Sequence, residues 1–386
     1  MKILILSASV GAGHGRAAEA LEAAFQTVLP KGSSVRHIDV LQLTNSVFRR
    51  IYGKAYFDLF RLSPHLLGYF YDYLDRPARG THFAVGDRLR LLTERANFRR
   101  LTALLRKERW DLIVNTHFLP AEIIASMRRR GTLTVPQATV TTDYDTHRLW
   151  VNQPCEHYFT ATPEGAAYLH YVGVPSDDLS VTGIPVHPSF AKSKGREVCR
   201  EKHGFLPDRP AILQLAGGFG VGPVEIIFKG LLGIERPLTV AVVSGSNAEV
   251  RERLEKIPVP SRHAVRILGF SKEIDELMEA ADLLVSKPGG LTSSEALTKG
   301  LPLAIVNPIP GQESRNSDFL LEAGAAVKIN NLCVLGEKVG GLLGEPERLA
   351  AMKENALRAA RPLAAITIAK RCLSLVDKKR SGGPRP

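Results

Sequence analysis

A buried strand, a glycine turn and a helix start follow one another directly in the C-terminal half of the chain. Residues 281–285 (ADLLV) are apolar enough for a buried parallel strand, and a Pro-Gly-Gly turn occupies 288–290. Residues 292–295 (TSSE) suit the first turn of a helix. Free backbone N–H groups and the helix dipole favour an anion at such a helix start, and glycines let it approach closely. The segment therefore predicts a phosphate site in an α/β domain.

Polar side chains around this turn extend the predicted site. Glu295 lies one turn into the expected helix, where a carboxylate can accept hydrogen bonds from a ribose diol. A second apolar strand is expected at 303–306, and Gln312, Glu313 and Asn316 follow it. One stretch of chain thus offers groups for a diphosphate, a ribose and a sugar.

Strand and helix patterns alternate in both halves of the chain, which predicts an α/β fold of two Rossmann-like, doubly wound domains. A two-proline connector at 183–188 separates a domain at 1–188 from one at 189–361. The segment 345–376 has a helical pattern that Pro362 interrupts, and the basic tail 378–386 is expected to be disordered. Strands are expected at 2–7, 34–40, 109–115, 134–140, 157–160, 179–181, 211–215, 238–243, 265–268, 283–285 and 303–306, and helices at 17–28 and 121–130.

The charge balance indicates an anionic partner. The chain carries 51 Lys and Arg against 39 Asp and Glu, a net charge of +12. Such a balance suits nucleotide phosphates, an anionic membrane or nucleic acid, and no recognition motif supports nucleic acid. The four cysteines have no close spacing, which favours a reducing cytosol, and no apolar run approaches the ~18 residues of a membrane span.

A second glycine loop follows the first strand. It begins Gly11-x-Gly13, as a dinucleotide fingerprint does, but Arg16 stands where the third glycine would be, which disfavours an NAD-dependent dehydrogenase. His14 is the unusual member, because a histidine in a loop at the carboxyl end of a strand can act as a general base. The other interpretation is a structural histidine that bonds the loop.

The region between the second strand and Arg109 has a different character. Phe48, Tyr52, Tyr56 and Phe60 fall on one side of a possible helix, and arginines and a lysine flank them. This pattern is typical of a helix that lies on an anionic membrane surface. It is also compatible with ordinary helix-on-helix packing, and both interpretations stay open.

Five motifs recur in a familiar order: GAGHG, GIPVHP, GGFG, KPGGLTSSEALTKGLP and NPIPGQE. Over residues 1–325 the chain resembles the monogalactosyldiacylglycerol synthases and processive diacylglycerol glucosyltransferases of glycosyltransferase family 28, relatives of the bacterial enzyme that makes lipid II. The resemblance implies the GT-B fold, with the nucleotide sugar in the C-terminal domain and the lipid acceptor in the N-terminal one. It also implies that the last helix, 362–377, crosses back onto the N-terminal domain.

The resemblance also implies roles for individual residues. His14 would deprotonate the acceptor hydroxyl, with Gly13, His117 and Asp143 on the acceptor side. Asp143 begins an Asp-Tyr-Asp string that looks like a metal motif of another glycosyltransferase fold. Here the string follows an N-terminal strand, so the expectation is that it borders the acceptor or orients His14 or His117, with no metal and no cofactor. The donor residues would be Gly290, Leu291 and Thr292 for the diphosphate, Glu295 for the ribose, Gln312, Glu313 and Asn316 for the sugar, Phe270 for the uracil, and Gly218 near the phosphates.

The expected function is therefore transfer of a hexose from a UDP-sugar to diacylglycerol, with inversion. The product would be a monoglycosyldiacylglycerol, and the enzyme would be cytoplasmic and peripheral on the cytoplasmic face of a membrane. Other lipid acceptors, such as a polyprenyl-linked sugar or a sterol, stay open. So do a UDP-sugar 2-epimerase, which would not need the aromatic, basic segment, and a non-catalytic protein that binds UDP-sugar and lipid. The choice between galactose and glucose is open too.

Overall fold

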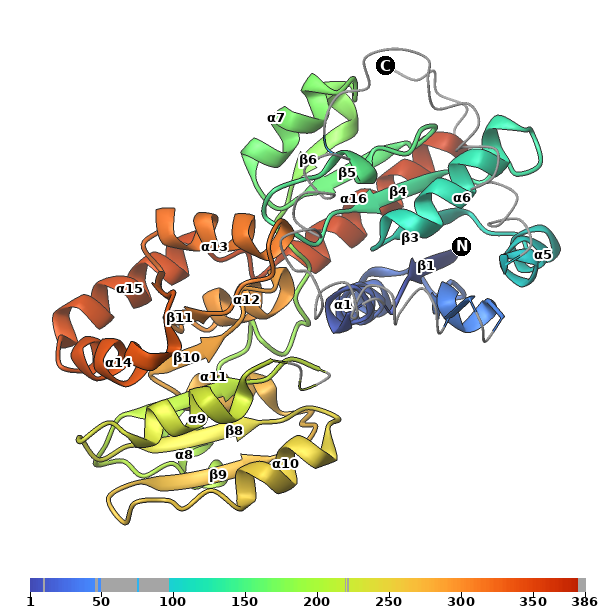
Figure 1. Ribbon diagram of the computed structural model, residues 1–386. Coiled ribbons are helices and arrows are strands. Elements are labelled where there is room, and N and C mark those ends of the chain that lie inside the picture. The colour runs from blue at the N-terminus through green and yellow to red at the C-terminus, as the bar shows by residue number, and fades with distance from the viewer. Residues whose placement is uncertain are drawn as a thin grey trace. The chain divides into compact units, whose positions relative to one another are not determined.

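The computed structural model describes residues 1–9, 11–45, 48–49, 75, 97–218, 220 and 222–380 (Figure 1). The chain forms two compact units. The first unit comprises Met1–Pro188, Pro310–Gln312 and Leu363–Pro386, and the second comprises Ser189–Ile309 and Glu313–Pro362.

The first unit is built on a six-stranded parallel sheet with the order β2-β1-β3-β4-β5-β6. The strands inside this sheet are buried over almost their whole length, as expected where helices cover both faces, whereas the edge strand at 34–39 (SVRHID) is only partly buried. The strands are β1 (Lys2–Ser7), β2 (Ser34–Asp39), β3 (Leu112–Asn115), β4 (Gln137–Val140), β5 (His157–Thr160) and β6 (Leu179–Val181). The helices are α1 (Ala12–Val28), α5 (Arg99–Lys107), α6 (Phe118–Arg129), α7 (Pro163–Tyr171) and α16 (Ala364–Arg380), with short 3-10 helices η1 (Val40–Leu43), η2 (Arg148–Trp150) and η3 (Ser176–Asp178).

Alternate residues of β1 pack into two different layers of this unit. Ile3 and Ile5 belong to a core cluster with α1 and α16, whereas Leu4 and Leu6 belong to a cluster with α5 and α6. The last helix of the chain is therefore part of the first unit (Figure 1). Its Ile368 is fully buried. This arrangement confirms the predicted return of the C-terminal helix to the N-terminal domain.

The second unit contains a second six-stranded parallel sheet, with the order β12-β11-β10-β7-β8-β9. Numbered within the unit, this is the 3-2-1-4-5-6 order of a dinucleotide-binding α/β fold. The strands are β7 (Ala211–Leu215), β8 (Thr239–Val243), β9 (Ala264–Leu268), β10 (Leu283–Ser286), β11 (Leu303–Val306) and β12 (Ala326–Ile329). The helices are α8 (Arg196–His203), α9 (Val224–Leu232), α10 (Ala248–Glu255), α11 (Ile274–Ala280), α12 (Gly290–Thr298), α13 (Gln312–Glu322), α14 (Leu335–Leu343) and α15 (Pro346–Ala359), with the 3-10 helix η4 (Leu332–Val334).

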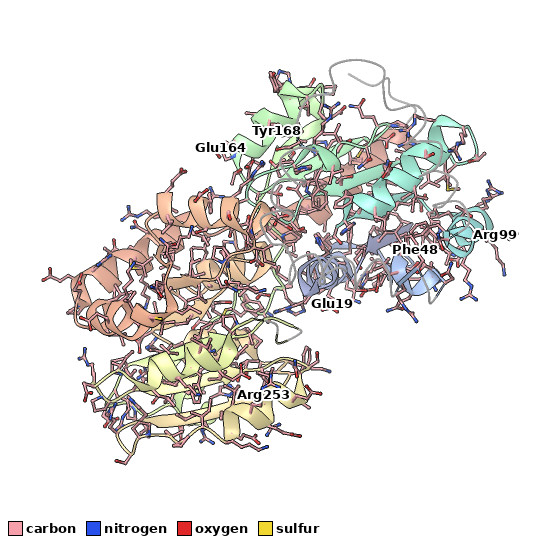
Figure 2. The ribbon with its side chains drawn as sticks, in the orientation of Figure 1. Glu19, Phe48, Arg99, Glu164, Tyr168 and Arg253 are labelled. Carbon is pink, nitrogen blue, oxygen red and sulfur yellow. The ribbon has the colours of Figure 1, made fainter. Side chains whose placement is uncertain are left out.

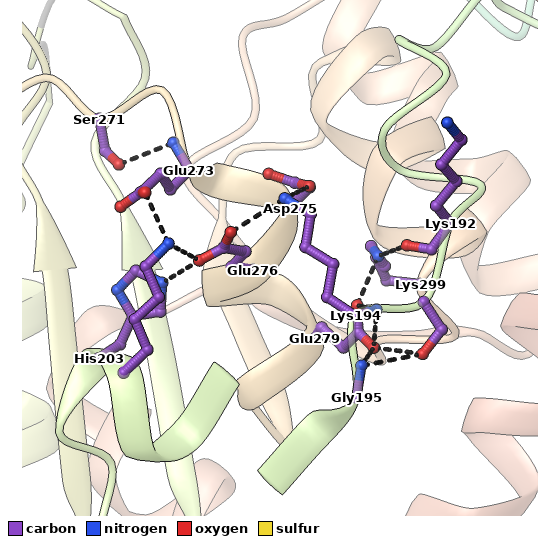
Figure 3. A network of polar contacts seen from close by, with 12 residues as sticks. Lys192, Lys194, Gly195, His203, Ser271, Glu273, Asp275, Glu276, Glu279 and Lys299 are labelled. Atoms are coloured by element: carbon purple, nitrogen blue, oxygen red, sulfur yellow. Dashed lines mark hydrogen bonds and ion pairs between the residues drawn. The ribbon is translucent and has the colours of Figure 1, made fainter. Parts of the chain in front are cut away.

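A polar network joins α8 to α11 in the second unit (Figure 3). Glu276 accepts from Lys194 (3.0 Å), Lys202 (2.6 Å) and His203 (2.8 Å). The Lys202 ammonium, aided by Lys194 and His203, holds the pKa of the Glu276 carboxyl at about 2. Glu279 accepts from the Lys299 ammonium at 2.7 Å. Because α11 ends just before β10 begins, this network fixes α11 near the amino ends of the strands.

The predicted α/β class and the two doubly wound sheets are confirmed, with local corrections. The helix expected at 17–28 begins at Ala12, because Gly11 (φ 114°) turns the chain and Ala12 can start a helix at once. Strand β12 was missed, and β3 and β4 begin later than predicted. The break near Pro362 lies between α15 and α16, and α16 continues to Arg380, into the segment expected to be disordered. Residues 381–386 lie outside the described residues.

Candidate functional site

The candidate acceptor residues lie where the strand order of the first sheet reverses. Strands β1 and β3 are neighbours, with Leu6 paired to Asn115, and the chain leaves them toward opposite edges of the sheet. Ligands of open α/β sheets bind at the carboxyl ends of the strands at such a point. His14 follows β1, Thr116 and His117 follow β3, and Thr142 follows β4. The fold therefore gathers these residues at one edge of the sheet.

His14 is held by two threonines. Its Nδ1 lies 3.0 Å from the carbonyl oxygen of Thr116 and 2.9 Å from Oγ1 of Thr142. The Thr116 hydroxyl also donates to the His14 carbonyl oxygen (2.9 Å). Because a carbonyl oxygen only accepts, the Thr116 bond requires the proton on Nδ1 and leaves the lone pair on Nε2. That is the tautomer of a histidine ready to take a proton.

Burial keeps His14 neutral. It lowers the pKa of the imidazole from 6.5 to about 4, although the hydrogen bond to Thr116 acts in the opposite direction. The residue still has partial exposure to solvent. Contrary to the sequence expectation, His14 lies in the first turn of α1 and not in a loop, and Gly13 precedes it in the same turn.

Aromatic rings surround His14. The His117 ring meets it edge-on with centroids 4.6 Å apart, and the Trp150 ring lies 6.2 Å away. Phe118 lies 4.2 Å from His117 and 6.0 Å from Trp150. His117 caps α6, and its Nδ1 accepts from the Leu119 N–H (3.0 Å). Burial, and then the neighbouring His14, lower the pKa of His117 well below its ordinary value.

The two threonines and Trp150 were missed by sequence reasoning. A threonine after a strand and a lone tryptophan carry no pattern of their own, and only the pairing of β1, β3 and β4 brings them to His14. Asp143, expected on the acceptor side, is buried at the same edge of the sheet. It accepts a hydrogen bond from Nε2 of Gln312 (2.5 Å), a residue grouped with the first unit.

Of the four residues predicted to contact a membrane, the structure describes Phe48. Its ring lies 5.4 Å from Phe98 in an edge-on contact, and it packs against the core cluster of Leu4 and Leu6 (Figure 2). This residue therefore contacts protein core on at least one side. Tyr52, Tyr56 and Phe60 lie outside the described residues. Within the described ranges, no helix is both long enough and apolar enough to cross a membrane.

The candidate donor residues lie where the second sheet reverses its strand order. Strands β7 and β10 are neighbours there, and a glycine turn follows each of them. Gly218 belongs to the turn after β7, and its carbonyl oxygen accepts from N–H and Oγ of Ser246 (3.2 and 3.1 Å). Gly245 allows this close approach, because a Cβ there would lie 2.6 Å from the Gly217 oxygen.

The turn after β10 leads straight into α12, as predicted. The first helical bond runs from Ser293 N–H to the Gly289 oxygen (2.9 Å), so the N–H groups of Gly290, Leu291 and Thr292 precede the helical ladder. They are the groups that can face an anion at the N-terminus of α12. Glu295 is buried one turn further along.

Three further donor candidates follow two other strands of this sheet, β9 and β11. Phe270 comes just after β9 and is 70% exposed, which leaves its ring accessible to a stacking partner. Glu313 and Asn316 lie in α13 after β11. Glu313 accepts from the Ile309 N–H (2.8 Å), and burial raises the pKa of its carboxyl against the opposing effect of Lys287. Asn316 is fully buried.

Two family models match the chain in succession. The model described as monogalactosyldiacylglycerol (MGDG) synthase covers residues 14–186, and the glycosyltransferase family 28 C-terminal domain covers 229–371. A processive diacylglycerol beta-glucosyltransferase of Bacillus licheniformis is 30% identical over 354 residues, which are 92% of this chain and 89% of the relative. The chain belongs to the diacylglycerol glycosyltransferases of glycosyltransferase family 28. A processive diacylglycerol beta-glucosyltransferase of Bacillus subtilis is 28% identical over 92% of this chain and 90% of its own.

Solved structures agree on the fold. Acinetobacter baumannii MurG matches with a TM-score of 0.61 at 16% identity, covering 97% of this chain and 99% of its own. The UDP-GlcNAc 2-epimerase of Neisseria meningitidis matches with a TM-score of 0.60 at 17% identity, covering 97% and 100%. The predicted GT-B fold is confirmed, and so is the prediction of a UDP-sugar-dependent glycosyltransferase of family 28.

Proposed function

We propose that this enzyme moves a hexose from a UDP-sugar to diacylglycerol and releases a monoglycosyldiacylglycerol and UDP. The observation that carries the proposal is His14, a neutral histidine with its Nε2 lone pair available at the switch point of the first sheet. Two relatives that are 28–30% identical to the chain are named processive diacylglycerol beta-glucosyltransferases, which supports diacylglycerol as the acceptor. The proposal requires no cofactor and no metal.

The second unit would hold the donor. The N–H groups of Gly290, Leu291 and Thr292, with the dipole of α12, would bind the diphosphate, and the Gly218 turn would close on it. Glu295, one turn into the same helix, would accept hydrogen bonds from the ribose hydroxyls. The exposed ring of Phe270 would stack on the uracil.

The reaction would proceed in one displacement. Nε2 of His14 takes the proton from the acceptor hydroxyl, and that oxygen forms a bond to the anomeric carbon while the bond from this carbon to the phosphate oxygen breaks. The N-terminus of α12 stabilises the charge that develops on UDP. Attack on the face opposite the leaving group inverts the anomeric centre. Gln312, Glu313 and Asn316 are the proposed contacts to the sugar.

The aromatic residues beside His14 suit a lipid acceptor. His117 and Trp150 are buried beside the base, and the partly exposed Phe118 packs against both and offers apolar surface where the glycerol end of diacylglycerol would bring its hydroxyl. An acceptor of this kind is presented by a membrane, so we place the enzyme on the cytoplasmic face of one. Its net charge of +12 favours an anionic surface. Tyr52, Tyr56 and Phe60, with the accessible part of Phe48, are the proposed membrane contacts.

The test is UDP release in the presence of diacylglycerol in anionic liposomes, with UDP-glucose, UDP-galactose and UDP-N-acetylglucosamine offered separately. We expect release with one donor that depends on the lipid and falls at least 100-fold in His14→Asn. The matched control is His170→Asn, since His170 is exposed on α7 and should be dispensable. Full activity of His14→Asn contradicts its role as base. Tight UDP binding without lipid-dependent release from any donor contradicts the proposed acceptor.

A further inference from the structure

We propose that Asp75 is a positioning residue of the acceptor site, which holds the turn that places Trp150 beside His14. This inference deepens the proposed function and rests on it for its effect on turnover. Asp75 lies in the aromatic, basic region between β2 and Arg109. No other residue of this region has a role in the proposed reaction.

One carboxylate oxygen of Asp75 accepts hydrogen bonds from two different segments of the chain. Its Oδ1 accepts from the Arg148 N–H (2.9 Å) and from the Tyr168 hydroxyl (2.7 Å), and His147 Nε2 lies 3.7 Å away. The Tyr168 hydroxyl also lies 3.2 Å from the Asp75 carbonyl oxygen. The Asp75 side chain is only 13% exposed, so water competes weakly for these bonds. Asp75 therefore links the start of η2 to α7, which carries Tyr168 (Figure 2).

The turn held by Asp75 carries Trp150, whose ring is buried beside His14. His147 caps η2: its Nδ1 accepts from the Leu149 N–H (3.0 Å), and its carbonyl oxygen accepts from the Trp150 N–H (3.0 Å). The bond to Leu149 places the neutral ring's proton on Nε2, the nitrogen nearer Asp75. Trp150 then sets its ring 6.2 Å from His14 and 6.0 Å from Phe118.

The same connection between β4 and β5 is held at a second point by α7. The Thr162 hydroxyl donates to the Tyr144 carbonyl oxygen (2.8 Å) and accepts from the Gly165 N–H (3.1 Å) as the cap of that helix. Because Thr162 fixes the start of the connection and the Asn152 N–H donates to the Tyr158 hydroxyl (3.1 Å) further along, loss of Asp75 should release the turn between them. His14 keeps its own bonds to Thr116 and Thr142, which Asp75 does not contribute to. The predicted defect is therefore a displaced ring and not a displaced base.

The experiment follows the Trp150 ring directly. The chain has two tryptophans, and Trp110→Phe leaves Trp150 as the sole one. In that background we expect Asp75→Ala to move the fluorescence emission to longer wavelength and to increase quenching by acrylamide. Tyr168→Phe, which removes one donor to Asp75, should produce a smaller change of the same sign. Unchanged emission and quenching in a folded Asp75→Ala protein overturn the proposal, whether or not the enzyme turns over.

Activity provides the second readout, with a double-mutant cycle. We expect Asp75→Ala to lower lipid-dependent kcat/KM roughly 10- to 100-fold, because small misplacements near a reacting group carry costs of this size. The affinity for UDP, measured by calorimetry, should stay within twofold. In a Trp150→Ala background, Asp75→Ala should add little further loss, since both changes act on the Trp150 ring. Fully additive losses, or weakened UDP binding that accounts for the whole defect, overturn the role of Asp75 as a positioning residue.

If Asp75→Ala does not fold, Tyr168→Phe carries the same test, because it removes one donor to Asp75 and keeps the shape of the side chain. Lack of turnover in the wild type with every lipid would contradict the proposed function instead. The fluorescence comparison would still decide whether Asp75 holds Trp150.

Discussion

Acidification should reveal how strongly the fold perturbs His14. The pKa of about 4 means that the imidazole is about 97% neutral at pH 5.5, whereas an ordinary histidine with a pKa of 6.5 would be about 9% neutral. If His14 is the base, kcat/KM should stay near its plateau down to about pH 5 and fall only as the pH approaches 4. The roughly tenfold difference at pH 5.5 separates the two cases.

The assay is lipid-dependent UDP release between pH 4 and 8, paired with a histidine NMR titration. The NMR signal that disappears in His14→Asn identifies His14 among the 11 histidines. A His14 signal that titrates near 6.5, with an acid limb at the same pH, would refute the reasoning that burial beside Thr116 and Trp150 depresses its pKa. An acid limb that persists unchanged in the residual activity of His14→Asn would assign it to another group.

The same shift predicts how stability depends on pH. The folded-state pKa lies below the unfolded value, so the unfolded chain binds more protons between pH 6.5 and about 4. This contribution is present above pH 6.5 and is lost as the pH falls toward 4. Its full size is about 3 kcal/mol, an upper value because the ring is partly exposed. On acidification, the free energy of unfolding of His14→Asn should fall less than that of the wild type, in urea titrations at matched pH.

Three further predictions address the donor unit and the C-terminal helix. Glu295→Ala should raise the Kd for UDP roughly 10- to 100-fold in calorimetry, by removing the proposed acceptor of the ribose hydroxyls, whereas an unchanged Kd would remove Glu295 from the site. Phe270→Ser should weaken UDP binding about 3- to 10-fold through lost stacking and leave the melting temperature unchanged, because the ring is 70% exposed; a large loss of stability would show that the ring is a packing residue instead. Ile368→Ala in α16 should lower the free energy of unfolding of the first unit by about 2–5 kcal/mol in urea titrations, and a change below 1 kcal/mol would contradict the burial of α16 there.

Local patterns predicted most of the elements, because most strands of the two sheets contain a short apolar run next to a turn or a glycine loop. Residues 2–7, 157–160 and 211–215 were predicted with the bounds that the structure shows. The start of α1 was placed late, since the two glycines on either side of Ala12 suggested a longer loop than Gly11 alone requires. Strand β12 has a mixed pattern at a sheet edge, AVKI, and it is recognisable only through its pairing with β11.

Only the part of the candidate site that lies next to glycine turns could be predicted from local patterns. Residues next to glycine turns, such as Gly290 and His14, carry a signal in the sequence itself. Thr116, Thr142, Trp150 and Asp75 carry none, because each acts through a contact between segments far apart in the chain. The pairing of β1 with β3 and of β3 with β4 brings the two threonines to His14, and bonds to Arg148 and Tyr168 place Asp75; no local spacing encodes either.

The most direct test of the central claim is the anomeric configuration of the product. The glycolipid formed from diacylglycerol and an α-linked UDP-hexose would be extracted and its anomeric proton coupling measured by NMR. A single displacement assisted by His14 predicts a β-linked hexose on the glycerol hydroxyl. An α-linked product, or the absence of any glycolipid while UDP is released, would contradict it.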